Sequence, residues 1–196
     1  MDNTFLAMLL RMKHISRWSL MFNTQQENLM QHTVECAFIT HFLALVGNCY
    51  FNKNYDAEKL CAYALFHDVS EVLTGDLPTP VKYFNEDIKA AYKDIEKIAC
   101  ERLLGFLPKE LREAYSSYFD SENLSEEERK LIKIADKLCA YIKCITELNA
   151  ANKEFQQALE STRKALDGIE SEELNYFLNN CLDSFSLSLD ELKGTL

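Results

Sequence analysis

The sequence contains little of the two residues that most often interrupt helices. Among 196 residues there are 5 glycines and 3 prolines, and every proline lies at or before Pro108. Runs that alternate Val, Ile or Thr with polar residues between hairpin turns are absent too, which argues against a sandwich or barrel of strands. The remaining composition is ordinary for a globular protein, with 47% hydrophobic and 27% charged residues. We therefore predict an all-α fold in which residues 1–196 form a single domain.

Cysteine pairing motifs and targeting segments are also missing. The seven cysteines form no Cys-x-x-Cys pair and lie mostly in apolar helical runs. We interpret them as small, reduced core residues and not as a disulfide framework or a zinc knuckle. The N-terminus lacks a basic segment followed by an apolar stretch and a cleavage site, and no apolar run approaches membrane-spanning length. These features predict a cytoplasmic protein with no membrane partner.

Positive charge is scarce relative to negative charge. There are 21 Lys and Arg residues against 31 Asp and Glu residues, so the net charge is 21 − 31 = −10. A chain this acidic does not attract phosphate backbones by bulk electrostatics. We therefore expect no nucleic acid polymer among its partners.

Helical spacing and capping signals predict the order of the helices. Ser125 and Glu128 form a capping-box signature at the start of the longest segment, and Gly47 is a plausible C-cap for an earlier one. Two prolines and a glycine predict a non-helical loop over residues 74–80. The last ten residues are expected to be loosely held. The expected helices span residues 3–14, 29–46, 57–73, 87–104, 108–119, 126–149 and 171–185.

The adjacent pair His67-Asp68 is the most informative feature that is present. It follows an apolar helical run, which would carry a carboxylate into or beside the core, where an unpaired charge is costly. His32 on an earlier predicted helix and Asp136 on a later one complete a set of two histidines and two aspartates. Nitrogen and oxygen donors of this kind suit an ion such as Mn, Fe, Co, Ni or Zn, and they leave coordination positions open for water and substrate.

Each of these residues also has a simpler interpretation. His67 alone fits a structural histidine, Asp68 a solvent-facing carboxylate, and His32 a surface residue near the start of its helix. Asp136 has lysines three residues before it and one residue after it, with which it could pair on a solvated face. Four such coincidences in one ordered pattern are less economical than one shared site. We therefore predict these four residues as the ligands of a metal ion.

A second metal ion would need more histidines near the first set. His41 follows His32 by nine residues, which places it about 180° around a helix at 100° per residue. We interpret His41 as structural, His14 as a helix-end residue, and the site as mononuclear.

The ordered pattern His…His-Asp…Asp resembles that of the HD-domain metal-dependent phosphohydrolases. Longer stretches resemble the bacterial YfbR-type 5′-deoxynucleotidases, and the likeness runs from about residue 5 to residue 192. The central match is far more specific than the scattered pattern. The resemblance implies a single all-α HD-domain helical bundle. The matching stretches are Arg17 to Met21, Glu27 to His32, Phe66 to Phe84, Ala135 to Cys144 and Ser184 to Glu191.

The same resemblance implies an enzyme that hydrolyses 2′-deoxynucleoside 5′-monophosphates to deoxynucleoside and phosphate. It implies one divalent ion, Co²⁺ in the first place, with Mn²⁺, Zn²⁺, Fe²⁺ or Cu²⁺ as alternatives, and a homodimer. In the family, the Arg17-Trp18 pair contacts the nucleotide and helps to exclude the ribose 2′-hydroxyl, while Asp76 contacts the substrate and takes part in proton transfer. The residues predicted to contact substrate are Arg17, Trp18, His32, Asp76, Leu77, Pro78 and Thr79.

Three residues are predicted to be catalytic: Glu71, Asp76 and Arg17. Glu71 lies one helical turn after His67, where its carboxylate could orient a water molecule or a histidine tautomer; the alternative is a glutamate on the helix surface. Asp76 lies in a rigid loop that could aim it into a pocket, or it could satisfy local amides. Arg17 supplies a planar fork of donors suited to phosphate. Lys82 is interpreted as a solvated loop lysine, with a neighbour of the substrate phosphate as the alternative.

Two other functions stay open. The first is another HD phosphohydrolase, which acts on nucleoside triphosphates or cyclic nucleotides; the short domain and the Arg17-Trp18 pair argue against it. The second is a non-catalytic HD module that binds a nucleotide, against which the presence of Glu71 and Asp76 argues, because a sensor needs no proton-transfer groups.

Overall fold

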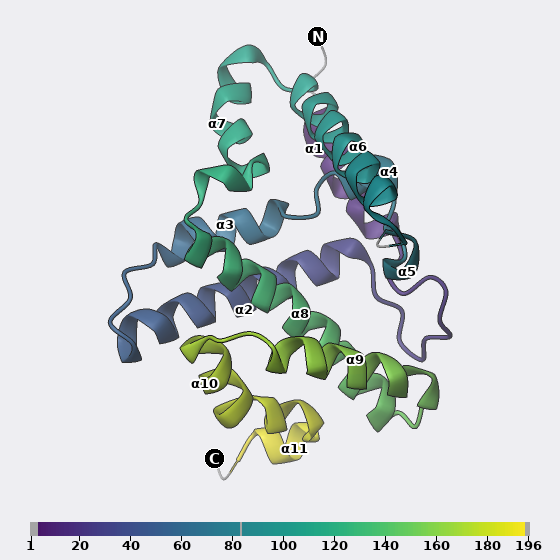
Figure 1. Ribbon diagram of the computed structural model, residues 1–196, viewed down its shortest axis with the longest axis vertical. Coiled ribbons are helices and arrows are strands. Elements are labelled where there is room, and N and C mark those ends of the chain that lie inside the picture. Colours follow the sequence, from purple (N-terminus) through teal and green to yellow (C-terminus); the bar gives the residue numbers. More distant parts are fainter. Residues whose placement is uncertain (1–3, 83, 195–196) are drawn as a thin grey trace.

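The computed structural model describes residues 4–82 and 84–194, and it is built from helices (Figure 1). The only pairing of extended backbone in these residues is an isolated antiparallel bridge between Ser16 and Asn28. The predicted all-α fold is confirmed. The α-helices are α1 (Phe5–Leu9), α2 (Leu29–Tyr50), α3 (Ala57–Phe66), α4 (Glu71–Thr74), α5 (Thr79–Lys82), α6 (Glu86–Gly105), α7 (Lys109–Phe119), α8 (Glu126–Asn149), α9 (Gln156–Asp167), α10 (Glu172–Asn180) and α11 (Leu189–Leu192). The 3-10 helices are η1 (Leu10–His14), η2 (Ser121–Asn123), η3 (Lys153–Phe155) and η4 (Leu182–Ser186).

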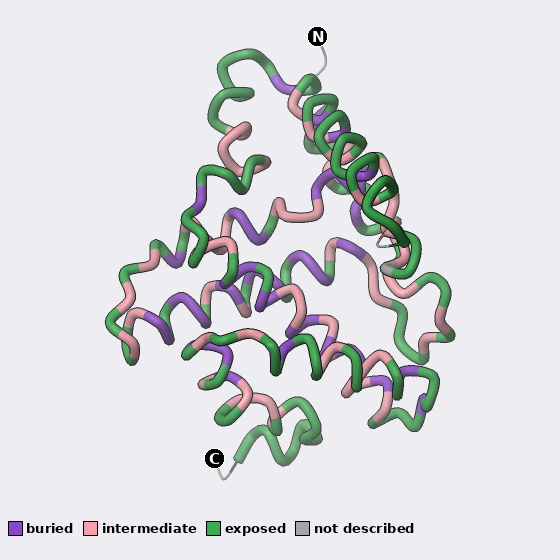
Figure 2. Tube along the Cα trace, in the orientation of Figure 1, coloured by how far each residue is buried: buried purple, intermediate pink, exposed green. Residues whose placement is uncertain are grey.

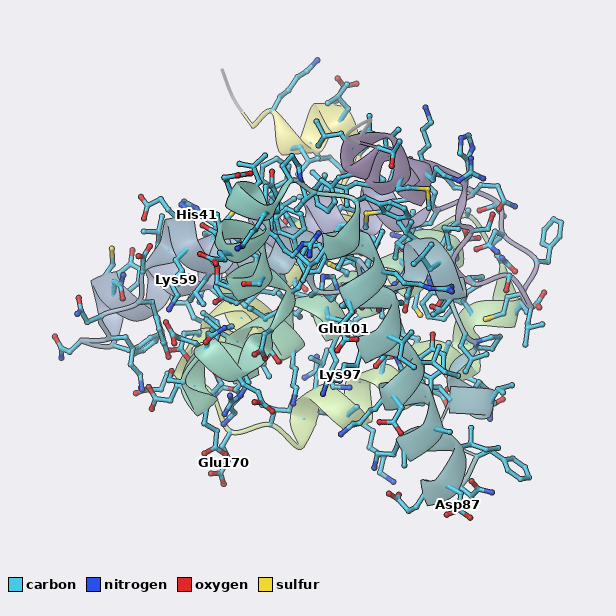
Figure 3. The ribbon with its side chains drawn as sticks, turned by 90° about the horizontal axis from the view of Figure 1, so that it is seen from above. His41, Lys59, Asp87, Lys97, Glu101 and Glu170 are labelled. Atoms are coloured by element: carbon cyan, nitrogen blue, oxygen red, sulfur yellow. The ribbon has the colours of Figure 1, made fainter. Side chains whose placement is uncertain are left out.

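Two long helices, α2 and α8, cross at the centre of the molecule (Figure 1). Helix α3 packs along α2, α9 packs along α8, and α10 packs on α2. Helices α1, α6 and α7 gather at one end, and α9, α10 and α11 gather at the other (Figure 1). Figure 2 shows that the buried residues concentrate along α2 and α8, whereas α6 and the C-terminal turns are mostly exposed. Figure 3 shows charged residues of α6, Asp87, Lys97 and Glu101, which are exposed.

The buried apolar residues form two clusters that meet near the start of α2. The larger cluster joins α2, α3, α8 and α10 and includes Cys36 and Ala135. The smaller cluster joins α1, η1, α6 and the chain between α3 and α4, and it includes Leu29, Val69 and Val72. The first turns of α2 therefore lie at the junction of two packed regions, which fixes their position from both sides.

Capping interactions set the start of the two central helices. The predicted capping box of α8 is confirmed: Glu128 N donates to Ser125 Oγ (3.2 Å), and Ser125 N donates to Glu128 Oε2 (2.7 Å). Helix α2 has a second box, in which Gln31 N donates to Asn28 Oδ1 (3.0 Å) and Asn28 N donates to Gln31 Oε1 (2.9 Å). This box fixes the first turn of α2, which ends at His32.

The predicted helix over residues 57–73 is wrong in its middle. Helix α3 ends at Phe66, and α4 begins only at Glu71. The intervening backbone forms tight turns, in which Val69 N donates to Phe66 O (3.1 Å) and Glu71 N donates to Asp68 O (3.0 Å). No Gly or Pro lies in this stretch, and His67 Nε2 and Asp68 Oδ2 lie 3.3 Å and 3.5 Å from His32 Nε2 on α2, so we attribute the break to these tertiary contacts.

Several other boundaries also differ from the prediction. Gly47 does not end α2, which continues to Tyr50; a Cβ at Gly47 would lie 2.7 Å from Tyr55 Cε2, so the glycine permits close packing. Residues 79–80, predicted as loop, begin the short α5, because proline is tolerated in a first helical turn. The predicted helix 171–185 ends at Asn180 and continues as η4, and α9 was not predicted. Residues 189–192, expected to be loosely held, form the capped turn α11.

The prediction that no apolar run approaches membrane-spanning length is wrong for α2, which is long and apolar enough to span a membrane by length and composition, although 56% of that window is buried inside the protein. A helix at the centre of a helical bundle meets the same criteria, so this is weak evidence for a membrane span. All seven cysteines are free, as predicted. Their interpretation as core residues is confirmed for Cys36, Cys139 and Cys144 and wrong for Cys49, which is exposed.

Candidate active site

The structure brings the four predicted metal ligands together. His32 comes from α2, His67 and Asp68 from the turns between α3 and α4, and Asp136 from α8. One nitrogen or oxygen atom from each side chain lies within 4.8 Å of the corresponding atoms of the other three. Their service as metal ligands stays a prediction, but the simpler interpretation of four unrelated polar residues does not hold.

The distances inside this cluster show that the donor atoms face one another. His32 Nε2 lies 3.3 Å from His67 Nε2, 3.2 Å from Asp136 Oδ1 and 3.5 Å from Asp68 Oδ2. His67 Nε2 lies 3.0 Å from Asp68 Oδ2. Two imidazole nitrogens and two carboxylate oxygens around one point fit a borderline divalent ion.

The hydrogen bond of the other ring nitrogen of His67, Nδ1, also favours a metal site. His67 Nδ1 lies 2.7 Å from Ala64 O, so Nδ1–H donates to this carbonyl and leaves the Nε2 lone pair free to face the cluster. Metal-binding histidines are usually held in this way. His32 Nδ1 has no hydrogen-bond partner in the described structure and lies 4.0 Å from Glu27 Oε1. The residues present therefore fit one divalent ion.

Electrostatics in the cluster favour positive charge at its centre. Burial lowers the pKa of His32, but hydrogen bonds to Asp136 and Asp68 raise it to about 9. Burial also opposes the charged form of His67, yet the Asp68 carboxylate holds the pKa of His67 well above its ordinary value. Burial raises the pKa of each carboxylate, but the imidazoles outweigh this effect. They hold the pKa of Asp68 well below its usual range and lower the pKa of Asp136. Without a metal ion, protons on the imidazoles supply the positive charge that the carboxylates require.

Arg17 lies directly beside the cluster. Its Nε donates to Glu27 Oε1 (2.8 Å), and its NH1 lies 3.7 Å from Asp68 Oδ2. Burial opposes its charge, but Glu27 and Asp68 raise the pKa of Arg17 above its ordinary value. Glu27 was assigned no role from the sequence; the available signal was an acidic residue directly before the α2 cap, in a stretch that also holds Arg17. The arrangement presents a fixed guanidinium next to the carboxylate of a predicted metal ligand.

Trp18 adopts backbone angles that are uncommon for a residue with a side chain. Its φ is +56°, in the left-handed region, and Trp18 O accepts hydrogen bonds from Met21 N (2.9 Å) and Asn23 Nδ2 (3.1 Å). The indole packs on Phe155, with ring centroids 5.3 Å apart, and its buried Nε1 has no hydrogen-bond partner in the described structure. Strain of this kind persists only where the surroundings impose it and is concentrated at functional sites.

Glu71 is buried, with 5% of its surface exposed, so its alternative interpretation as a helix-surface glutamate is wrong. Burial, together with the charges of Asp68 and Asp76, raises the pKa of Glu71 to about 8. Its Oε2 is buried without a hydrogen-bond partner in the described residues. Burial likewise raises the pKa of Asp76, although Arg17 opposes this shift. The structure thus holds two carboxyl groups near the cluster that retain protons more readily than usual.

The segment after α4 connects these carboxyl groups to α6. Leu77 and Pro78 are half-buried, whereas the side chain of Thr79 lies outside the described part of the structure. Lys82 is not a solvated loop lysine: its Nζ donates to Glu96 Oε1 (2.8 Å) and lies 4.7 Å from the Tyr92 ring centroid.

The two remaining histidines lie elsewhere. His14 ends η1, as predicted, and it is exposed. His41 is half-buried on α2, and Figure 3 shows it at the flank of the molecule. It is not part of the candidate metal group, which agrees with its interpretation as structural.

Comparison with known proteins assigns the chain to a family. The model of the YfbR-like 5′-deoxynucleotidases matches residues 4–185. A 5′-deoxynucleotidase of Enterobacter sp. (strain 638) is 50% identical over 188 residues, which cover 96% of this chain and 94% of that protein. A 5′-deoxynucleotidase of Yersinia pestis (strain Pestoides F) is 48% identical, covering 96% and 95%. The chain belongs to the YfbR-like 5′-deoxynucleotidase family. The predicted family and the predicted enzyme class are confirmed.

Solved structures show the fold of this YfbR-like protein in more distant relatives. An HD-domain phosphohydrolase from Listeria innocua has a TM-score of 0.82 at 20% identity and covers 97% of this chain and 92% of its own. The cyanophage S-2L HD phosphohydrolase DatZ, bound to dA and one catalytic Zn²⁺ ion, has a TM-score of 0.62 at 20% identity, covering 92% and 95%. These likenesses confirm the predicted HD-domain helical bundle.

Proposed function

We propose that this 5′-deoxynucleotidase hydrolyses 2′-deoxynucleoside 5′-monophosphates at one divalent ion held by His32, His67, Asp68 and Asp136. The observation that carries the proposal is the convergence of the four side chains within 4.8 Å, with the Arg17 guanidinium 3.7 Å from one ligand oxygen. A divalent ion there would polarise the phosphoryl group and make a water molecule easier to ionise. We propose Co²⁺ as the ion that supports activity, with Mn²⁺, Zn²⁺, Fe²⁺ and Cu²⁺ as alternatives; the Zn²⁺ ion of DatZ supports a divalent ion in general.

Arg17 is proposed to orient the phosphate. Its ion pair with Glu27 occupies Nε and leaves NH1 on the side of Asp68, 3.7 Å from Oδ2. A phosphate there would receive charge-assisted hydrogen bonds while negative charge develops on its oxygens. Arg17 thus serves both binding and catalysis.

Glu71 and Asp76 are proposed to handle the protons. Hydrolysis forms a bond between a water oxygen and phosphorus, breaks the bond from phosphorus to O5′, and requires a proton on the departing O5′. A raised pKa suits Asp76 to deliver this proton, because the group is then more often protonated near neutral pH. Glu71, whose Oε2 has no hydrogen-bond partner among the described residues, is proposed to orient the attacking water.

Trp18, Leu77, Pro78 and Thr79 are proposed to contact the nucleotide, and Trp18 to exclude the ribose 2′-hydroxyl. Excluding one hydroxyl requires a rigid wall that offers it no polar partner. The constrained backbone of Trp18 and its packing on Phe155 support such a wall.

A substrate panel tests the proposal against its alternatives. Metal-loaded protein is expected to release phosphate from deoxynucleoside 5′-monophosphates and much less from matched ribonucleotides. Preferred hydrolysis of nucleoside triphosphates or cyclic nucleotides would favour another HD phosphohydrolase activity. Binding of deoxynucleotide without turnover would favour a non-catalytic module. Asp68→Asn is the matched control, because it keeps the side-chain shape and removes the ligand charge.

We also propose a homodimer in the cytoplasm. Helix α2 exposes an apolar stripe of Val34 (40%), Phe38 (72%), Phe42 (40%) and Leu45 (43%), which recur at helical spacing on one face. Such a stripe supports a two-fold interface in which the same face of a second copy covers it. Phe38→Glu is expected to yield monomers by light scattering. Seven free cysteines support a reducing compartment.

A further inference from the structure

Three buried polar residues, Lys143 and Glu147 on α8 and Asn152 just after it, hydrogen-bond to the loop (residues 16–28) that carries Arg17 and Trp18. Glu147 has no exposed surface (0%), and Lys143 and Asn152 are each 8% exposed. Charges are retained in such surroundings only when their polar atoms have partners. The partners of this group lie more than a hundred residues away in sequence, within residues 16–28.

Both carboxylate oxygens of Glu147 accept hydrogen bonds from the loop. Glu147 Oε2 accepts from Thr24 N (2.9 Å) and Thr24 Oγ1 (2.7 Å), and Oε1 accepts from Gln25 N (3.2 Å). Lys143 Nζ donates to Glu147 Oε1 and to Gln25 O. Burial opposes the charge of Glu147, but hydrogen bonds from Asn152, Lys143 and Thr24 hold its pKa well below its usual range. The ionised carboxylate therefore holds the backbone of the loop directly.

The same group continues toward Trp18. Asn152 Nδ2 donates to Glu147 Oε2 (2.8 Å) and to Phe22 O (2.9 Å). Phe155, three residues after Asn152 and fully buried (0%), is the ring on which the Trp18 indole packs. Lys143 Nζ lies 5.6 Å from the Phe155 ring centroid. The loop and the ring behind Trp18 are thus held by one connected set of contacts.

Helix α8 sets this group in register with the metal ligands. Lys143 and Glu147 follow Asp136 by seven and eleven residues, so at 100° per residue they lie within about 20° of the same face. At 1.5 Å per residue, they lie about 10 Å and about 16 Å farther along the axis. The same helix therefore fixes the positions of Asp136 in the cluster and of Lys143 and Glu147, which hold the loop.

We propose that Glu147 is a positioning residue for discrimination between deoxyribose and ribose. Together with Lys143 and Asn152, it fixes the loop against α8, so that Trp18 stands at a constant distance from the metal cluster. Without the anchor, Trp18 samples several positions and the space for a 2′-hydroxyl opens. The inference rests on the proposed role of Arg17 and Trp18 in nucleotide binding.

Glu147→Gln tests this role, with Glu173→Gln as the matched control. Glu173 is also a buried glutamate (4% exposed) and accepts hydrogen bonds from Tyr55 Oη (3.2 Å) and Ser171 Oγ (2.6 Å), but it lies on α10 and both of these partners lie outside the loop. For Glu147→Gln, the ratio of kcat/KM for deoxynucleotide over ribonucleotide is expected to fall roughly 10- to 100-fold, as when a partner that orients a site residue is removed. KM for the deoxynucleotide should rise more than kcat falls, while the affinity for Co²⁺ stays unchanged. Glu173→Gln should keep the ratio of the unsubstituted enzyme.

The fluorescence of Trp18, the only tryptophan in the chain, tests the fastening without turnover. Acrylamide should quench it more strongly in Glu147→Gln and not in Glu173→Gln. If Glu147→Gln does not fold, Thr24→Val serves as the test variant, because it removes the hydrogen bond from Thr24 Oγ1 to Glu147. It should lower the kcat/KM ratio and increase the acrylamide quenching, each by a smaller amount. Unchanged quenching and an unchanged ratio in a folded variant overturn the proposal. No preference for deoxynucleotide in the unsubstituted enzyme would instead refute the proposed role of Trp18, and the quenching result would still test the anchor.

Discussion

Metal binding to this protein should release protons. In the absence of metal, the imidazoles of His32 and His67 carry raised pKa values because they face the carboxylates of Asp68 and Asp136. A metal ion needs the lone pairs of neutral imidazoles, so it must displace these protons. The apparent affinity for the ion should therefore keep rising above pH 7, where an ordinary histidine is already mostly neutral.

The size of the effect follows from the pKa of His32, which is about 9. pH 7 lies about two units below this pKa, so removing the proton from His32 costs about 2.7 kcal/mol. The apparent metal affinity is therefore about 100-fold weaker than it would be with neutral His32. If only His32 is displaced, the apparent Kd should fall about tenfold per pH unit between pH 6 and pH 8. If His67 loses its proton as well, the fall should approach about 100-fold per unit.

Calorimetry with chelator-treated protein measures both quantities. Titrations of Co²⁺ in buffers of different ionisation enthalpy give the number of protons released at each pH, and competition with a chelator of known affinity gives the apparent Kd. Metal-free Asp136→Asn is the informative variant, because losing one of the carboxylates that raise the pKa of His32 should lower that pKa in an NMR titration of the imidazole. An apparent Kd independent of pH from 6 to 8, with no proton release, would refute the reasoning.

Four further predictions concern single residues. Glu71→Gln should remove a pH dependence of the unfolding free energy, measured by thermal melts of metal-free protein. The pKa of Glu71 is raised from 4.5 to about 8, so the protonated carboxyl contributes its full stabilisation below about pH 4.5. This stabilisation, at most about 5 kcal/mol, is lost as pH rises through 8. Arg17→Ala should bind metal with unchanged affinity yet lower kcat/KM by roughly 10²- to 10³-fold, the range for losing a donor to developing charge. Asp136→Asn should lose metal and phosphate release together by metal analysis and assay, and metal retention would contradict its assignment as a ligand. Gly47→Ala should destabilise the fold by about 1–3 kcal/mol in denaturant unfolding through overpacking against Tyr55, while the deoxynucleotide preference stays unchanged.

Local signals in the sequence were sufficient for the long helices. The Ser125–Glu128 box fixes the start of α8 by hydrogen bonds within one turn, so its boundary could be predicted from four residues. The ordered pattern of His32, His67-Asp68 and Asp136 identified the cluster, because carboxylates carried into a core need a positive partner and the two histidines supply the remaining donors for an ion.

Features that depend on contacts between distant segments could not be predicted in this way. The break between α3 and α4 has no glycine or proline, and it places His67 and Asp68 beside His32 of α2. Gly47 resembles a helix terminator in sequence, but its role is set by Tyr55, which packs against its backbone. Lys143 and Glu147 resemble an ordinary i,i+4 surface pair; only the fold places residues 22–25 over them.

The spacing of the cluster along the chain has a consequence for how the protein unfolds. His32 and His67 are 67 − 32 = 35 residues apart, and Asp68 and Asp136 are 136 − 68 = 68 residues apart. An ion bound to all four would cross-link three distant segments, as a pair of disulfides would, in a chain whose cysteines are all free. Closing loops of this length is entropically unfavourable in an unfolded chain, so a preformed site exists only after α2 and α8 have packed. The ion would then act as a reversible cross-link between these segments, and a chelator should accelerate unfolding without breaking a covalent bond.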